Sequence, residues 1–261
     1  MLRVLVIAGT IDARQIVEQL LKYGVSVTAT VTTHLGGSLL KQYEGVDIRE
    51  GGLTLKEMMD LIHDINAGCV IDASHPFARD ASLNSIEASK NMSIPYLRYE
   101  RPQTQGLNEE VIRVKDFNEA VDKLKEFTGN IFLTIGSNKL LLFTGISDFE
   151  KRVFARVLPD SQVIAKCEEL GLNANNILAI KGPFSVEMNV EMIKHCNASV
   201  VVTKDSGSAG GNEEKLHAAK KLGIPVIMIE RPRIEYRCVV SNVDKVMEFV
   251  KDLATKNNTG K

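Results

Sequence analysis

Apolar residues in this chain fall into short continuous runs that alternate with segments of helical spacing. The first run covers residues 4–7 and stops at Gly9. Apolar residues then recur at the spacing of one helix face, as at Ile16, Val17 and Leu20. A strand covered on both faces of a parallel sheet has no need to alternate apolar and polar residues. The start of the chain therefore predicts a buried parallel strand, a tight turn and a helix.

The same alternation continues along the chain. Further strands are predicted at residues 25–31, 69–72, 94–98, 131–135, 153–157, 177–180, 200–203 and 226–229. Helices are expected after four good N-cap residues that precede apolar stripes, namely Thr54, Asp116, Ser185 and Ser241. Strands that alternate with helices indicate an α/β protein with mainly parallel sheets.

Two segments of the chain repeat each other at a constant offset. Residues 88–95, followed by Glu100-Arg101-Pro102, match residues 218–225, followed by Glu230-Arg231-Pro232. Chance is the alternative, but the matched distance favours two α/β halves of related layout. A short polar stretch at 103–108 is a suitable linker. We therefore expect an N-terminal Rossmann-like domain at 1–105 and a C-terminal one at 106–261.

Composition narrows the class of protein. The chain has 261 residues, of which 44% are hydrophobic and 25% charged, as in ordinary soluble globular proteins. Its formal net charge of −1 gives no overall attraction to nucleic acid or to an anionic membrane. No apolar run approaches the roughly 20 residues of a membrane span. Neither nucleic acid nor a membrane is an expected partner.

Cysteine and histidine usage argues for a cytoplasmic protein without a metal site. The four cysteines lie far apart and form no C-x-x-C pair, which favours free thiols over disulfides or structural zinc. The five histidines form no H-x-x-H or H-x-x-x-H pair.

The strand ends gather the residues that have no evident structural role. In parallel sheets, ligands bind beyond the carboxyl ends of the strands. The first half places Gly9, Thr10, Ser74, His75 and Pro76 there, and the second half places Gly136, Ser137, residues 182–185 and residues 204–207 there. If the two edges face each other, these loops line an interdomain active-site cleft.

The first turn is suited to an anion. The unpaired N–H groups at the start of a helix and the positive end of its dipole attract phosphate or pyrophosphate. Any α/β protein can open in this way, so the single Gly9 is not specific for a dinucleotide.

These loops resemble those of one enzyme family. The motifs are Gly9-Thr10-x-Asp12-Ala13-Arg14, residues 72–78, residues 98–102, Gly182-Pro183-Phe184-Ser185 with residues 187–189, and residues 203–207 with Gly210-Gly211 and Glu214-Lys215. In order and in spacing, up to about Pro232, they resemble the precorrin-6A reductase family of cobalamin biosynthesis, including its cobalt-precorrin-6A branch. The resemblance implies two Rossmann-like domains with the active site between them. It also implies reduction of one double bond of a corrin precursor by hydride from a nicotinamide, giving the 6B compound.

The chain departs from the family pattern at its first turn. Ala8 stands where a second glycine is usual, and Asp12 where glutamate is commoner. The second strand ends at Thr32-Thr33-His34 without the acid that NAD-preferring sites place there, and no arginine follows to hold a 2′-phosphate. Both NADPH and NADH are therefore expected candidates.

The resemblance assigns cofactor contacts mainly to the first half. Phosphate and ribose contacts are expected from Gly9, Thr10, Asp12, Ala13, Arg14 and Thr32, with Ser74, Gly136 and Ser137 near the nucleotide. The structural alternative for Thr10 or Asp12 is an ordinary helix cap. For His75, a hydrogen bond to the loop backbone is the alternative to protonation or substrate contact.

A tetrapyrrole substrate with acetate and propionate arms needs cationic donors. The candidates are Arg79, Arg98, Arg101, Lys139 and Lys204, with Gly182, Ser185 and Ser206 shaping the wall. Arg98 and Arg101 have the alternative of a salt bridge with Glu100 or with the partner domain. Catalysis is expected from Lys204, which can reach a reactive group, oriented by Asp205, together with His75.

Two other functions stay open at this point. Glycine turns after a first strand also hold S-adenosylmethionine, so a methyltransferase of a related pathway is one alternative. A non-enzymatic nucleotide sensor is the other. The oligomeric state, monomer or homodimer, is not predicted.

Overall fold

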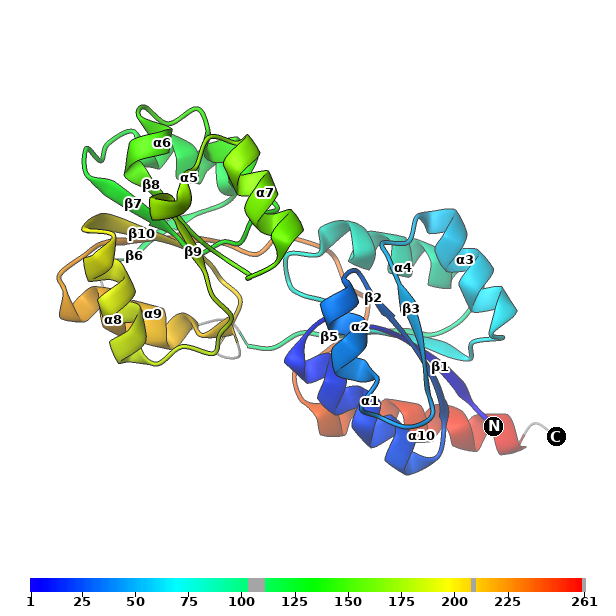
Figure 1. Cartoon of the computed structure of the whole chain (residues 1–261). Helices are drawn as coiled ribbons and strands as arrows, with labels where there is room; N and C mark the ends of the chain where they lie inside the picture. The colour runs from blue at the N-terminus through cyan, green and yellow to red at the C-terminus, as the bar shows by residue number, and fades with distance from the viewer. Residues whose placement is uncertain (103–110, 208–209, 260–261) are drawn as a thin grey trace. The chain divides into compact units, whose positions relative to one another are not determined.

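The computed structural model describes residues 1–102, 111–207 and 210–259. The chain forms two compact units, which we name the first unit (Met1–Pro102 with Arg233–Lys261) and the second unit (Gln103–Pro232). Each unit contains one six-stranded sheet in which all paired strands are parallel, with helices on both faces (Figure 1). The predicted α/β class with two Rossmann-like units is therefore confirmed.

The first unit contains eleven elements among the described residues, and its strand order is β12-β5-β4-β1-β2-β3. The elements are β1 (Arg3–Ile7), α1 (Ile11–Tyr23), β2 (Ser26–Val31), α2 (His34–Leu40), β3 (Val46–Glu50), α3 (Leu55–Asp64), β4 (Cys69–Asp72), α4 (Arg79–Asn91), β5 (Tyr96–Tyr99), β12 (Val239–Val240) and α10 (Val243–Thr259).

The second unit has the strand order β6-β11-β10-β7-β8-β9. Its elements are β6 (Val111–Val114), α5 (Phe117–Leu124), β7 (Asn130–Leu133), η1 (Leu140–Phe143), α6 (Phe149–Arg152), β8 (Val153–Val157), α7 (Ser161–Glu169), η2 (Ala174–Asn176), β9 (Ile177–Ala179), α8 (Val186–His195), β10 (Ala198–Lys204), α9 (Asn212–Lys221) and β11 (Val226–Ile229).

The two sheets have the same layout, which confirms the repeat seen in the sequence. β5 begins directly after Pro95, and β11 begins directly after Pro225, the matching residue of the repeat. Both strands lie next to the edge strand of their sheet. In each unit, the edge strand is supplied by the segment that follows the corresponding strand of the other unit. The chain passes from β5 to β6, which pairs with β11, and from β11 to β12, which pairs with β5.

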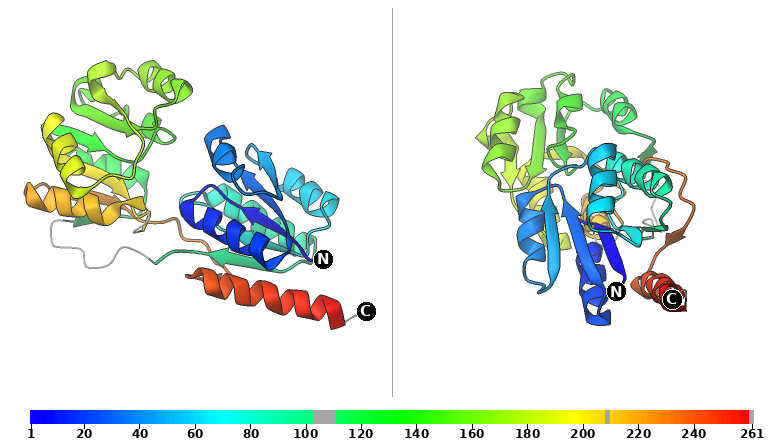
Figure 2. Two further views of the ribbon diagram at one scale, coloured as in Figure 1. Left: turned by 60° about the horizontal axis from the view of Figure 1, so that its bottom comes forward. Right: turned by 90° about the vertical axis from the view of Figure 1, so that its right-hand side faces the viewer.

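The boundary of the second domain differs from the prediction. Arg233–Lys261 belongs to the first unit, whereas the sequence placed these residues in the C-terminal domain. In β12, Val239 pairs with Arg98 of β5, and α10 packs along α1 with Val246 and Val250 fully buried (Figure 2). The two-residue strand β12 has no detectable periodicity, so the pattern of the sequence did not reveal this return.

The apolar runs are buried because helices cover both sides of the sheet. In β1, Val4 and Val6 face the cluster that contains α1 and α10, while Leu5 and Ile7 face the cluster under α3 and α4. All four are at most 4% exposed, as the continuous run predicted. At about 25 cal/mol per Å² of apolar surface, such burial is the main favourable contribution to folding.

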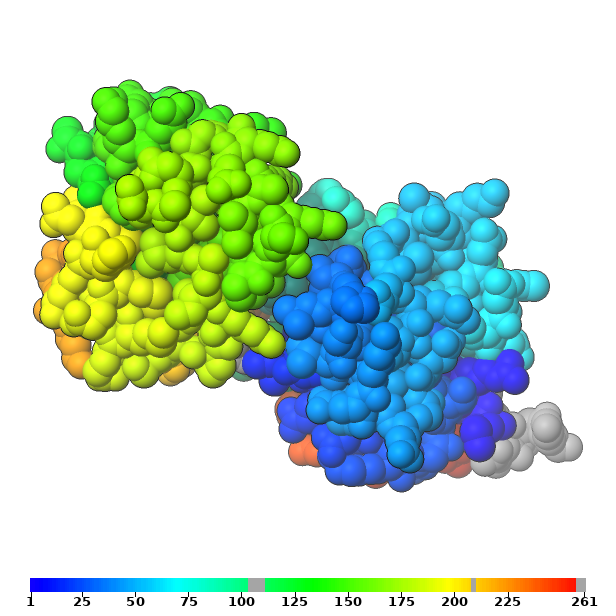
Figure 3. Space-filling model, in the orientation of Figure 1, coloured from blue at the N-terminus to red at the C-terminus, as the bar shows by residue number. Residues whose placement is uncertain are grey.

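Helix caps at three of the four predicted positions are confirmed. The fourth prediction, Ser241, is wrong, because the Oδ1 of Asn242 accepts from Lys245 N at 2.9 Å and caps α10 instead. Thr54 forms both bonds of a capping box with Glu57, Asp116 accepts from Glu119 N at 2.9 Å, and Ser185 accepts from Met188 N at 3.2 Å. The apolar pattern did not predict α2 and β3, and β3 is the edge strand of the first sheet. The α2 segment contributes to the visible surface of the first unit (Figure 3), and β3 contains no fully buried residue, so neither has a strong apolar pattern.

Candidate cofactor and substrate sites

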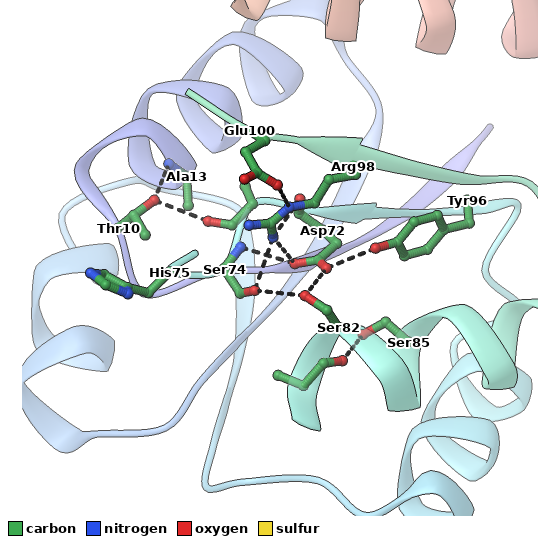
Figure 4. Close-up of polar contacts among 12 residues, drawn as sticks. Thr10, Ala13, Asp72, Ser74, His75, Ser82, Ser85, Tyr96, Arg98 and Glu100 are labelled. Atoms are coloured by element: carbon green, nitrogen blue, oxygen red, sulfur yellow. Dashed lines mark hydrogen bonds and ion pairs between the residues drawn. The ribbon is translucent and has the colours of Figure 1, made fainter. Parts of the chain in front are cut away.

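The turn between β1 and α1 is held by one hydroxyl. Gly9 has φ of +112°, a backbone conformation that favours glycine. Thr10 caps α1: its Oγ1 accepts from Ala13 N at 3.0 Å and donates to the carbonyl of Ala73 at 3.0 Å (Figure 4). Thr10 is thus an N-cap that also ties the first turn to the loop after β4.

The start of α1 offers donors to an anion. The first helical bond runs from Arg14 N to Thr10 O at 3.3 Å, so the amides of Ile11 and Asp12 precede the hydrogen-bonded ladder. No heavy atom lies within 4 Å of the position that a Cβ on Gly9 would take. A phosphate therefore has both open space and the positive end of a 13-residue helix at this turn.

Asp12 and Arg101 form an ion pair inside the first unit. Arg101 Nη2 lies 2.5 Å from Asp12 Oδ2, and the side chains are 8% and 15% exposed. The sequence left two roles open for Arg101, a substrate contact and a salt bridge. The structure contains a salt bridge, and its partner is Asp12, which the sequence did not suggest. Because Arg101 neutralises Asp12, the carboxylate does not leave a net negative charge at the start of α1.

Asp72, the last residue of β4, is the centre of a buried polar network (Figure 4). Its Oδ1 accepts from Arg98 Nη1 at 2.8 Å and from Ser74 N at 3.0 Å. Its Oδ2 accepts from Ser82 Oγ at 2.6 Å and from Tyr96 Oη at 2.8 Å. Burial, the charge of Asp72 and this hydrogen bond raise the pKa of Tyr96.

Arg98 is enclosed in this network. Its side chain is 1% exposed, its Nε lies 3.3 Å from Glu100 Oε2, and its Nη1 also donates to Ser74 Oγ at 3.1 Å. The guanidinium lies 5.3 Å from the ring centroid of Tyr236, which comes from the C-terminal segment of the first unit. The structure therefore contains the salt bridge with Glu100 that was the alternative role for Arg98. It also contains a shorter ion pair, 2.8 Å, with Asp72, which the sequence did not suggest.

His75 follows this network in the loop after β4. Its Nδ1 lies 3.1 Å from Phe77 N and accepts from that amide, so in the neutral ring the proton is on Nε2. The side chain is half-buried. The structural hydrogen bond proposed as one role for His75 is thus present.

The loop after β10 holds the second group of charged residues. Asp205 is buried with its carboxylate 3.9 Å from Arg113 Nη1 and 3.7 Å from Arg231 Nη2, and its carbonyl accepts from Arg231 Nε at 3.0 Å. Lys204 ends β10, and burial lowers the pKa of its ammonium to about 8. Ser206 is 7% exposed and donates to the carbonyl of Lys204.

Lys215 is a charged residue of this region for which the sequence suggested no role. It is 6% exposed, and its Nζ donates to Thr203 Oγ1 at 3.3 Å, Gly210 O at 3.0 Å and Asn212 Oδ1 at 3.1 Å. Burial, with the charges of Arg156 and Lys204, lowers its pKa to about 7. The signal for it was its place in the Gly210-Gly211-x-x-Glu214-Lys215 motif, but burial of a lysine is not visible in a sequence.

The remaining predicted residues lie at the carboxyl edges as expected. Arg14 lies at the start of α1, Thr32 follows β2, Arg79 begins α4, and Thr32 and Arg79 are exposed. In the second unit, Gly136 has φ of +74°, the backbone carbonyl of Ser137 accepts from Leu140 N at 3.2 Å, and exposed Lys139 precedes η1. Gly182 lies against Phe184, and Ser185 caps α8.

Each unit therefore assembles its own group of sequence-predicted residues. The first unit brings together Gly9, Thr10, Asp12, Ala13, Ser74 and His75 at the ends of β1 and β4. The second gathers Lys204, Asp205 and Ser206 after β10.

None of the described helices has the length and the apolar composition that a membrane span requires.

Comparison with known proteins gives a consistent result over nearly the whole chain. The family model described as precorrin-6x reductase CbiJ/CobK matches residues 3–251. The cobalt-precorrin-6A reductase of Priestia megaterium is 41% identical over 248 residues, covering 94% of this chain and 96% of the relative. The cobalt-precorrin-6A reductase of Methanothermobacter thermautotrophicus is 36% identical over 258 residues, covering 95% and 83%.

The fold agrees with these sequence matches. A solved structure of CobK precorrin-6A reductase superposes with a TM-score of 0.81 at 26% identity, covering 97% of this chain and 98% of that one. The family that the loop motifs suggested is thus found independently by sequence and by structure. The chain belongs to the precorrin-6x reductase family.

Proposed function

We propose that this protein reduces one double bond of the precorrin-6A or cobalt-precorrin-6A macrocycle to the 6B compound in cobalamin biosynthesis. The observation that carries the proposal is the match over 94% of the chain to a relative named cobalt-precorrin-6A reductase. The loops that carry the family motifs lie at the carboxyl edges of the two sheets, where parallel α/β units bind ligands.

The reductant in this proposal is NADPH or NADH, with its pyrophosphate at the start of α1. Gly9 leaves the space, the first amides of α1 supply donors, and Arg101 neutralises Asp12 beside them. A bound nicotinamide would supply the hydride. The residues of this unit orient the cofactor, since the Thr10 bond to Ala73 fixes the turn against the loop that carries Ser74 and His75.

Lys204 is the proposed proton donor for the reduced double bond. Burial lowers the pKa of its ammonium to about 8, so at neutral pH Nζ still holds a proton that it releases more readily than an exposed lysine does. Exposed Arg79 and Lys139 remain proposed contacts for the carboxylate arms of the macrocycle. Ser185 and Gly182 remain proposed wall residues.

The test is anaerobic incubation with the 6A macrocycle, with and without cobalt, while nicotinamide absorbance is followed for each cofactor. We expect oxidation of the nicotinamide only when the macrocycle is present. No oxidation of either cofactor with either macrocycle would refute the proposal. Transfer of a methyl group from added S-adenosylmethionine, seen as a mass increase of the product, would instead support the methyltransferase.

The role of Lys204 is tested separately. Lys204→Ala is expected to lose most turnover while the affinity for the cofactor is retained, and the turnover of the unmodified protein is expected to fall above about pH 8 as the ammonium deprotonates. Lys194→Ala, on the exposed side of α8, is the matched control. Normal turnover in Lys204→Ala would remove Lys204 from the site.

A further inference from the structure

Arg156 is a buried cation that has no acidic partner among the described residues. It lies on β8, is 8% exposed, and its Nη1 donates to Asn189 Oδ1 at 2.8 Å and contacts Met192 Sδ at 3.8 Å. Within the described parts of the chain, no carboxylate forms an ion pair with this guanidinium, and its Nε and Nη2 groups donate to no acceptor. An arginine has five N–H donors, so most of its donor capacity is unused.

The guanidinium is nevertheless held in one place. The ring centroid of Phe184 lies 4.3 Å from Cζ and that of Phe132 lies 5.6 Å from it. Asn189 is itself oriented, because its Nδ2 donates to Ser185 O at 2.8 Å and its Oδ1 is thereby turned to Arg156. Stacking and one fixed hydrogen bond thus position a planar donor whose other N–H groups are not used by the described residues.

Lys215 is a second buried cation of the second unit. The charges of Arg156 and Lys204 both lower its pKa, and the charge of Glu214 raises it. The three Nζ donors of Lys215 are used by Thr203, Gly210 and Asn212, so Lys215 has none left for an anion, whereas Arg156 has Nε and Nη2.

A buried charge without a partner destabilises a fold, and such a group is commonly found where a ligand supplies the partner. Carboxylates match the planar guanidinium by two parallel N–H···O bonds. We propose that Arg156, held by Asn189 and Phe184, binds a carboxylate arm of the macrocycle. This inference rests on the proposed function and names a substrate-binding residue for it.

Two substitutions test the inference. Arg156→Met fills the space without charge, and Arg156→Lys keeps the charge but lacks the planar pair of donors. Loss of a charge-assisted hydrogen bond predicts a KM for the macrocycle raised by a factor of about 10 to 100 in Arg156→Met. We expect a smaller rise in Arg156→Lys and an unchanged KM for the nicotinamide. Lys194→Met on α8 is the control.

Two further measurements separate this role from its alternatives. The thermal midpoint of Arg156→Met is expected to be equal to or above that of the unmodified protein, because an unpaired buried charge is removed. Binding of uroporphyrin, a tetrapyrrole with acetate and propionate arms, is followed by its absorbance and is expected to weaken at least about tenfold, which requires no turnover. A raised KM for the nicotinamide would show a cofactor phosphate at Arg156 and overturn the inference.

The two proposals can fail separately. Absence of turnover in the unmodified protein refutes the reductase function, whereas the uroporphyrin measurement still reports on Arg156. Turnover in the unmodified protein with equal macrocycle KM and equal uroporphyrin binding in Arg156→Met refutes the carboxylate site alone. If Arg156→Met does not fold, Arg156→Lys carries the same comparison.

Discussion

Replacing Asp72 by Asn tests whether the buried network stabilises the first unit. The side chain of Asp72 is completely buried and accepts four hydrogen bonds, from Arg98, Ser74, Ser82 and Tyr96. Asparagine preserves the shape but removes the charge opposite Arg98, which is 1% exposed. Its NH₂ group also faces two hydroxyl donors in place of an acceptor oxygen.

The expected loss of stability is large. Removing one partner of a buried ion pair costs about 3–5 kcal/mol, and the lower end applies because Glu100 still lies 3.3 Å from Arg98 Nε. In a chain of this size, about 3 kcal/mol shifts the thermal midpoint by roughly 6–12 °C. An exposed pair is worth about 0–1 kcal/mol, so Asp47→Asn, which breaks the surface pair with Arg49, is the matched control.

Tyrosine fluorescence is suited to this measurement. The chain has no tryptophan, and its five tyrosines all lie in the first unit, namely Tyr23, Tyr43, Tyr96, Tyr99 and Tyr236. Urea unfolding followed by tyrosine emission therefore reports on the first unit, while circular dichroism reports on both. If Asp72→Asn and Asp47→Asn unfold at free energies within about 1 kcal/mol of each other, the network does not have the stabilising role argued from its burial.

Two other changes have defined outcomes. Burial lowers the pKa of Lys215 to about 7 from 10.5, so between these values the unfolded chain holds a proton that the folded chain has released, and stability rises with pH. Lys215→Met is expected to remove up to about 1.4 kcal/mol per pH unit of that rise. The free energy of unfolding is measured by urea titration at about pH 7.5 and about pH 8.5, and the same increase between the two pH values in Lys215→Met and in the unmodified protein would contradict this. Thr10→Ala loses the α1 cap and the bond to Ala73, so we expect a loss of about 1–2 kcal/mol and a raised KM for the nicotinamide, with Thr10→Ser close to normal. An unchanged KM in Thr10→Ala would show that the turn does not position the cofactor.

Local pattern was sufficient for most strands, several caps and the two-unit layout. A strand covered on both faces must be apolar throughout, which is why residues 69–72, 153–157 and 226–229 were predicted with the bounds that the structure shows. Caps such as Thr54 and Asp116 act on amides three residues away, so their chemistry is also local. The loop motifs, taken together, identified the family.

Contacts between distant residues decided the rest. The sequence showed Arg98, Arg101 and Lys204 as cations near strand ends, but only the fold determines that Asp72 and Asp12 pair with the two arginines and that Lys204 is desolvated. The same holds for Arg156, whose partner Asn189 comes from another element, and for β12 and α10, which return to the first unit after the second is complete. Burial and ion pairing depend on which segments meet in space, and the order of residues along the chain does not specify that.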